Sequence, residues 1–180
     1  LTGEDAETGI VVVARDRKDH LFVLAARSVQ ASGRAAAMAA WRAMDEYGAD
    51  TMVYEENLGK RYLEEVLRDA YKELVEQGVF PRNTSAPMKP VHAKHGKRTR
   101  AEPVAMRSEQ GRLHLVGEHP KLEDQMILFD PESTRESPDH MDAMVHACLR
   151  LMAGEKKRMS ISDPGQYSLD LDRSFDFSRL

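Results

Sequence analysis

The sequence predicts an α/β fold in which helices cover the faces of a mixed sheet. Two short apolar runs, residues 9–14 and 21–26, flank a charged turn and predict a β-hairpin. After this hairpin, helical and strand-like segments alternate along the chain. That order is typical of a sheet with helices packed on it.

The elements of the first half follow in order from this pattern. Residues 1–8 are polar and predict a loop before the hairpin, and residues 33–47 predict an alanine-rich helix that ends at Gly48, a residue suited to helix C-termini. Residues 50–55 predict a strand that Asn57 and Gly59 terminate. An amphipathic helix then runs to about residue 77. Its expected apolar stripe is Tyr62, Leu63, Val66, Leu67, Ala70, Tyr71 and Leu74.

The second half alternates in the same way. The expected elements are a short strand near Val91, a helix over 96–110, a strand over 112–116, a short helix over 121–129 and a last helix over 137–152. Pro103 has to sit in the first turn of its helix or break it. Ser137 and Pro138 predict the start of the last helix, as N-cap and first helical residue.

The domain organisation follows from a change in composition. Residues 154–180 are rich in serine and aspartate, which predicts a polar tail after one domain over residues 1–153. The chain begins with Leu1, which favours a fragment or a processed product, and it contains neither a secretory signal nor the ~20 apolar residues of a membrane helix. Its one cysteine, Cys148, excludes an internal disulfide framework, fits a reducing cytosol and falls on an expected core stripe.

Two groups of acidic residues are candidates for chemistry. Glu55 ends a strand, and ligands of α/β sheets bind beyond strand ends. Its position alone favours a solvated carboxylate, since Glu56 follows it directly. Asp139 and Asp142 lie on one face of the last helix, and His146 continues that line. The helix dipole alone would favour the two aspartates there. Carboxylates held in this way are nevertheless suitable ligands for a hard divalent cation.

A basic segment completes the candidate site. Residues 89–100 carry seven basic or histidine side chains and no acidic one, in a chain whose net charge is −4. Such a segment is either a solvated loop or a contact for nucleic-acid phosphates, and without interleaved aromatics it favours the backbone of a duplex. Carboxylates with a polyanion-binding segment are what two-metal phosphodiester hydrolysis needs.

Six stretches, in order, resemble the C-terminal nuclease domain of phage terminase large subunits over about residues 5–152. They include Glu-x-Asn-x-Gly from Glu55, Gly-Lys-x-x-Arg-Ala-Glu-Pro-Val from Gly96, and Ser-Pro-Asp-His-Met-Asp-Ala-Met-Val from Ser137. The resemblance implies an RNase H-like fold and a Mg²⁺- or Mn²⁺-dependent endonuclease that cuts concatemeric double-stranded DNA.

The resemblance also implies roles for particular residues. Glu55, Asp139 and Asp142 would be the catalytic metal ligands of a two-metal site. The expected DNA contacts are Lys94, Lys97, Arg98 and Arg100. A virus-encoded protein of this kind would act in the host cytoplasm with the portal, the small terminase subunit and an ATPase domain of the same parent chain, and not at a membrane.

One departure keeps alternatives open. The family's first catalytic aspartate lies on a strand upstream of the loop formed here by residues 1–8, so we expect that first strand to be missing from this chain. The other hypotheses are a RuvC-type junction resolvase, which shares the Asp-x-x-Asp-Ala spacing at Asp139, and a non-catalytic fragment that binds DNA or the portal.

Overall fold

The computed structural model describes residues 7–30, 33–55, 60–82, 85–92, 96–130 and 139–158. It shows an α/β protein, with five strands and five helices in these ranges, so the predicted fold class is confirmed. None of the described helices is long and apolar enough to cross a membrane. The predicted loop over residues 1–6 and the predicted tail from residue 159 lie outside the described residues.

The predicted hairpin is present and longer than expected. β1 (Glu7–Arg15) pairs antiparallel with β2 (Leu21–Gln30), so Glu7 and Thr8 are strand residues and not part of a loop. Glu7 pairs with Gln30 and Thr8 pairs with Val29, so the antiparallel pairing of the two strands continues through these polar residues. β5 (Leu113–Leu115) joins β2 in parallel, which gives the order β1-β2-β5.

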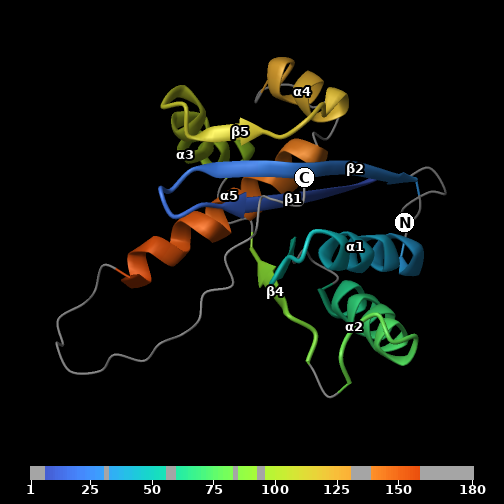
Figure 1. Cartoon of the computed structure of the whole chain (residues 1–180). Coiled ribbons are helices and arrows are strands. Elements are labelled where there is room, and N and C mark those ends of the chain that lie inside the picture. Colours follow the sequence, from blue (N-terminus) through green and yellow to red (C-terminus); the bar gives the residue numbers. More distant parts are fainter. Residues whose placement is uncertain are drawn as a thin grey trace, which may run out of the picture.

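The remaining strands form a second, smaller sheet. β3 (Met52–Glu55) pairs in parallel with β4 (Met88–Val91), and no strand pairing joins them to the hairpin within the described part of the chain. Helix α5 (Asp139–Arg158) connects the two sheets instead, because it packs on β1 and β2 and also contacts β3. Figure 1 shows this helix behind the hairpin strands.

The first core lies between α1 (Arg34–Glu46) and α2 (Lys60–Glu76). Trp41 is fully buried there, and its indole N–H donates a hydrogen bond to the carbonyl of Leu67 at 2.9 Å. The predicted stripe of α2 is wrong at its start, where Tyr62 is 68% exposed. Leu63 is also 41% exposed. Periodicity identifies the apolar face of α2 but does not show which of its residues a neighbouring element covers.

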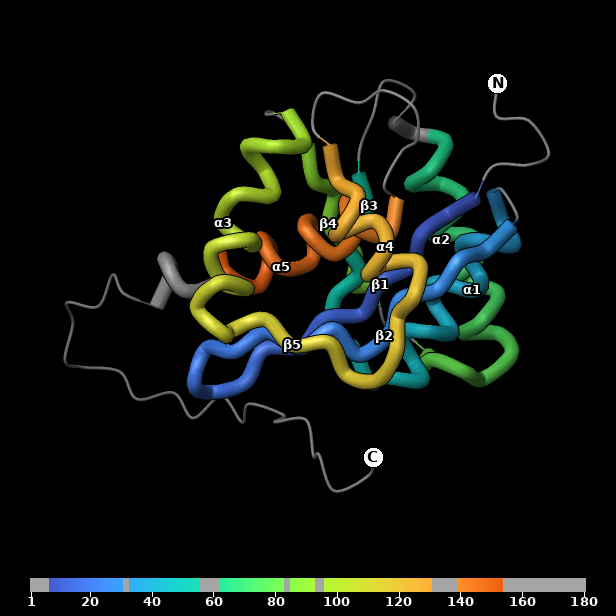
Figure 2. Tube along the Cα trace, turned by 90° about the horizontal axis from the view of Figure 1, so that it is seen from above, coloured from blue at the N-terminus to red at the C-terminus, as the bar shows by residue number. Residues whose placement is uncertain are grey.

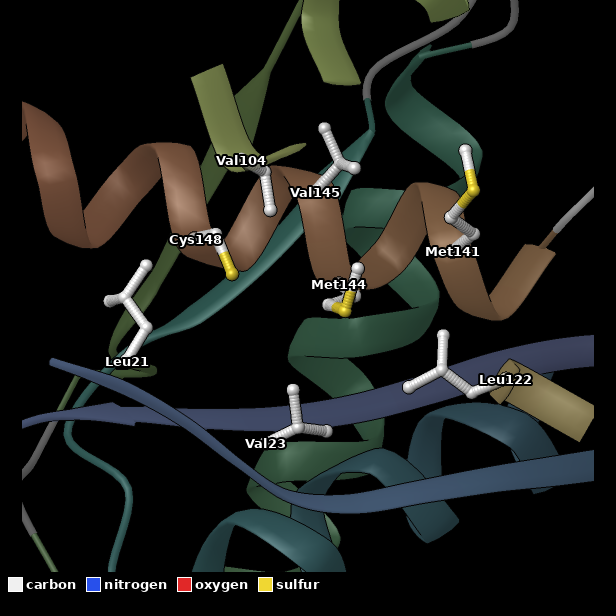
Figure 3. Packing of buried hydrophobic residues seen from close by; sticks show 8 residues of the cluster. All are labelled: Leu21, Val23, Val104, Leu122, Met141, Met144, Val145 and Cys148. Carbon is white, nitrogen blue, oxygen red and sulfur yellow. The ribbon is translucent and has the colours of Figure 1, made fainter. Parts of the chain in front are cut away.

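The second core joins the hairpin to the C-terminal helices. It contains side chains from β2, α3 (Lys97–Glu109), α4 (Pro120–Ile127) and α5. Figure 3 shows its buried residues: Leu21, Val23, Val104, Leu122, Met141, Met144, Val145 and Cys148. The expected core role of Cys148 is confirmed, and burial raises the pKa of its thiol to about 12. The thiol therefore stays protonated at neutral pH.

Two expectations about helix boundaries are wrong. Pro103 lies inside α3, past its first turn, and the helix continues through it. Proline removes one helical hydrogen bond, but burial of the next residue, Val104, holds α3 against the core. α5 continues to Arg158, beyond the end expected at Met152.

The start of α5 is fixed by contacts that local sequence does not reveal. The proposed cap residues Ser137 and Pro138 lie outside the described residues. The Gln125 side chain of α4 accepts hydrogen bonds from the backbone N–H groups of His140 and Met141, both at 3.0 Å. These donors would otherwise lack partners in the first helical turn.

Gly9 allows β1 to approach this helix start closely. A Cβ atom at this position would lie 2.8 Å from Cδ2 of His140 and 2.9 Å from the backbone carbonyl of Asp139. Because part of this contact is backbone, rotation of a side chain cannot relieve it. We therefore expect Gly9→Ala to lower the free energy of unfolding by about 1–3 kcal/mol, as overpacking does. Urea unfolding followed by circular dichroism measures the change, and an unaltered midpoint would contradict the close packing.

Candidate active site

Glu55 stands where the sequence places it, at the end of a strand. It is the last residue of β3, paired in register with Val91 at the end of β4. Its side chain is 33% exposed. The carboxylate therefore lies at the carboxyl edge of a parallel pair, where α/β proteins bind ligands.

Asp142 lies in the first turn of α5, and its side chain is 16% exposed. The partial positive charge of the helix N-terminus favours a carboxylate at this place. Asp139 is the first residue of the same helix and lies in the same turn. Within the described residues, the ion pairs of Arg100 and Lys97 include Glu55 and Asp142 but not Asp139.

Arg100 brings the strand end and the helix start together. Its Nη1 atom lies 3.8 Å from Oε1 of Glu55, and its Nη2 atom lies 3.5 Å from Oδ1 of Asp142. The side chain is only 9% exposed, and α3, which carries it, packs against α5. Figure 2 shows α3 next to α5, on the left side of the view. Two carboxylates that are distant in sequence therefore meet on one cationic group.

Lys97 adds a second cation to Asp142. Its Nζ atom lies 2.9 Å from Oδ2 of Asp142, and the lysine side chain is 39% exposed. Asp142 therefore contacts a different basic side chain with each of its carboxylate oxygens. The contact of Asp142 with Arg100 is shielded from solvent, whereas its contact with Lys97 is accessible. The two ion pairs therefore contribute differently to stability.

His146 is a further member of this cluster that the sequence analysis did not assign to the site. Nη1 of Arg100 lies 2.5 Å from Nε2 of His146. Burial lowers the pKa of His146, and the charge of Arg100 lowers it further, whereas Glu55 and Asp142 act in the opposite direction. The imidazole is therefore neutral at pH 7. In the sequence, the position of His146 one helical turn after Asp142 was the signal that could have placed it in the site.

The basic residues predicted for DNA binding have different surroundings. Arg98 is exposed on the first turn of α3, and Lys97 is partly exposed beside it. Arg100 points inward to the carboxylates, an arrangement that the charge pattern of the segment did not indicate. Lys94 lies outside the described residues.

The donor types of the cluster fit a divalent cation. Glu55 and Asp142 offer hard oxygen atoms to one position, and a positive group already occupies it. Among the described residues, no three His, Cys, Asp or Glu side chains are grouped so that they could hold an ion. The guanidinium of Arg100 lies between the carboxylates of Glu55 and Asp142.

A family model described as the terminase RNaseH-like domain matches residues 2–151. The chain belongs to this family. The match contains every residue of the Arg100 cluster, and no curated protein matches the chain. The RNase H-like α/β fold is thus established, and the chain is a terminase domain of the nuclease type.

Replacement of Arg100 tests whether the cluster holds α3, β3 and α5 together. We expect Arg100→Met to lower the free energy of unfolding by about 1–3 kcal/mol, because two carboxylates lose a shared cation. The loss stays below that of a fully buried pair, since Lys97 remains on Asp142 and Glu55 is partly solvated.

Arg98→Met is the matched control, because Arg98 is exposed on the same helix and its replacement should change stability by less than about 0.5 kcal/mol. Chemical denaturation at neutral pH measures both variants. Equal effects of the two substitutions would show that the inward contacts of Arg100 are not stabilising.

Proposed function

We propose that this terminase domain is a divalent-metal-dependent endonuclease that cuts concatemeric double-stranded DNA during phage genome packaging. The observation that supports this most directly is the convergence of Glu55 and Asp142 on one cationic group. In a domain of the terminase RNaseH-like family, carboxylates from a strand end and a helix start are suitable ligands for Mg²⁺ or Mn²⁺.

The chain's own residues would hold and shield the site. Glu55 and Asp142, with Asp139 as the predicted third carboxylate, would supply the anionic ligands of a two-metal centre. When bound, such cations activate a water molecule and stabilise the leaving oxygen of the phosphodiester. β4 positions Glu55 through strand pairing, and the buried face of α5 positions Asp142. The carboxylates are thus carried on regular elements and not on loops.

The basic start of α3 would bind the DNA backbone. Lys97 and Arg98 lie in its first turn, which contains no acidic residue, and the helix N-terminus adds partial positive charge. Lys97 is partly exposed and can exchange Asp142 for a phosphate. Lys94 is the further contact predicted from sequence. A protein of this kind would act in the host cytoplasm with the portal, the small terminase subunit and an ATPase domain.

A non-catalytic DNA-binding domain is the second candidate, and one observation favours it. Arg100 and Lys97 already neutralise Asp142, and Arg100 also faces Glu55. Ion pairs of this kind could be a permanent structural feature, and the basic residues of α3 would still attract DNA. A junction resolvase of the RuvC type is a third possibility and differs in its preference for branched DNA.

Nicking of supercoiled plasmid in the presence of Mn²⁺ tests the proposed activity. We expect Glu55→Gln and Asp142→Asn each to reduce the nicking rate at least about 100-fold. Each substitution removes the negative charge of a metal ligand and keeps the shape of the side chain. Glu65→Gln, on the exposed surface of α2, is the matched control and should cleave at the wild-type rate.

The same assay separates the alternatives. DNA retention without cleavage by the wild-type chain would favour the binding domain. Faster cleavage of four-way junctions than of linear duplex would favour a resolvase. Cleavage that survives both carboxylate substitutions would exclude Glu55 and Asp142 as the catalytic pair.

The salt dependence of DNA binding tests the role of α3. We expect Arg98→Ala and Lys97→Ala each to reduce the slope of log K against log salt concentration by about one unit. Each variant makes one phosphate contact fewer, so DNA binding releases about one counterion fewer. Lys72→Ala, an exposed lysine on α2 that pairs with Asp69, should leave the slope unchanged. Fluorescence anisotropy with a labelled duplex in EDTA gives the slopes, and three equal slopes would argue against a contact at α3.

A further inference from the structure

We propose that the turn end of the hairpin binds an unpaired nucleotide of single-stranded DNA, whose base stacks on the aromatic cluster of His20, Phe22 and His114 and whose phosphate contacts Arg112. This ligand differs from the duplex that we assign to the start of α3. The inference does not depend on cleavage, and it would hold equally for a domain that only binds DNA.

The three rings of the aromatic cluster are nearly parallel. Nδ1 of His20 lies 2.7 Å from Nε2 of His114, and the two ring planes differ by 5°. A ring N–H lies in the plane of its imidazole, so this hydrogen bond holds the two histidines side by side. Phe22 stacks on His114 with the ring centroids 4.8 Å apart. The two imidazoles therefore form one flat surface that is wider than a single ring.

The strand order determines which side of this surface a base can reach. Phe22 and His114 are paired residues of β2 and β5, and their rings are separated by about the distance between neighbouring strands. Phe22 thus covers the ring face of His114 that is turned toward the middle of the sheet. β5 is the last strand in the order β1-β2-β5, so the other ring face is directed past the edge of the sheet. Both imidazoles are only half-buried.

The aromatic cluster lies on the face of the sheet opposite the second core. Leu21 and Val23, the neighbours of Phe22 in β2, are fully buried in that core. Successive residues of a strand point to opposite faces, so Phe22 and its partner His114 point away from it. Figure 2 shows the hairpin turn beside β5, with α3 and α5 on one side of them. The rings belong to neither core and are available to a ligand.

A surplus of positive charge lies beside the rings. Asp19 in the hairpin turn contacts Arg107, and its carboxylate also lies 3.4 Å from Arg112 and 3.9 Å from Arg15. One carboxylate cannot neutralise three guanidinium groups. Arg112 is 44% exposed and precedes His114 by two residues, so extended backbone directs both side chains to the same face. A base stacked on His114 would therefore have a guanidinium near its phosphate.

The tip of the turn adds two more cations. Arg17 and Lys18 are exposed there. The carboxylate of Asp16 accepts hydrogen bonds from the backbone N–H groups of Lys18 and His20, at 2.9 and 2.8 Å, so this acidic residue is engaged in shaping the turn. Aromatic rings beside basic side chains bind single strands without sequence preference, because every base has a flat aromatic face. The bases of a duplex are already stacked and paired, so the rings favour an unpaired nucleotide.

Binding of labelled oligothymidine to the whole chain in EDTA, followed by fluorescence anisotropy, tests this inference. We expect His114→Ala to weaken binding at least about fivefold, because stacking of a base on the imidazole is lost. Affinity for a duplex of the same length should change less than about twofold, since paired bases do not reach the rings. Tyr62→Ala is the control, because Tyr62 is an aromatic residue on α2 that is 68% exposed, and it should bind both probes like the wild type.

Arg112→Gln tests the phosphate contact. We expect it to reduce the slope of log K against log salt concentration for oligothymidine by about 0.7 unit, the value for one phosphate contact with a single strand. Arg42→Gln, on the exposed surface of α1, is the matched control and should leave the slope unchanged. Equal slopes in the two variants would contradict the phosphate contact.

Photocrosslinking keeps the test decisive if His114→Ala is poorly folded. An oligonucleotide that contains iododeoxyuridine crosslinks on irradiation to an aromatic side chain against which the base is stacked, so the wild-type chain should be modified at His20, Phe22 or His114. Crosslinks confined to α3, or equal losses of single-strand and duplex affinity in His114→Ala, would overturn the inference. Because EDTA removes divalent ions, neither result bears on the proposed cleavage, which the nicking assay tests separately.

Discussion

The ion pairs of Arg100 are the interaction on which the candidate site depends. One nearly buried guanidinium contacts the end of β3 and the first turn of α5, and its own helix, α3, contacts both α5 and β5. A charge removed from water requires partners. The partners of Arg100 come from different elements, so its burial also fixes how these elements lie relative to one another. Stability and site geometry therefore rely on the same contacts.

Hydrophobic packing of α5 determines where the acidic and histidine side chains point. Met144, Val145 and Cys148 bury one face of the helix against the hairpin of β1 and β2, which leaves the face with Asp142 and His146 toward Arg100. The close contact at Gly9 and the side-chain cap from Gln125 fix the start of the helix. Since Asp142 lies in the first turn, small shifts of this start would move its carboxylate.

Short-range patterns in the sequence were sufficient for the hairpin, the helices and the positions of Glu55 and Asp142. Alternation, helical periodicity and turn residues act over a few residues and identify these elements, although α3 continues through Pro103. The inward turn of Arg100 was not predictable in this way, because a basic segment does not show which of its side chains meets a carboxylate from another element. The separate β3–β4 pair and the exposed Tyr62 likewise depend on tertiary neighbours.

The arrangement of charges also explains how one site could accommodate both a polyanion and divalent cations. Two carboxylates close to one position repel each other unless a positive group lies between them, and Arg100 and Lys97 provide it here. Under the proposed function, DNA phosphates offer new partners to Lys97, and divalent ions offer new partners to the carboxylates. A phosphate that pairs with Lys97 leaves Asp142 free for a divalent ion, and an ion bound to Asp142 leaves Lys97 free for a phosphate. DNA and the metal would therefore increase each other's affinity by the same factor. In this view the internal ion pairs keep the site folded in the absence of substrate and couple metal loading to the arrival of DNA.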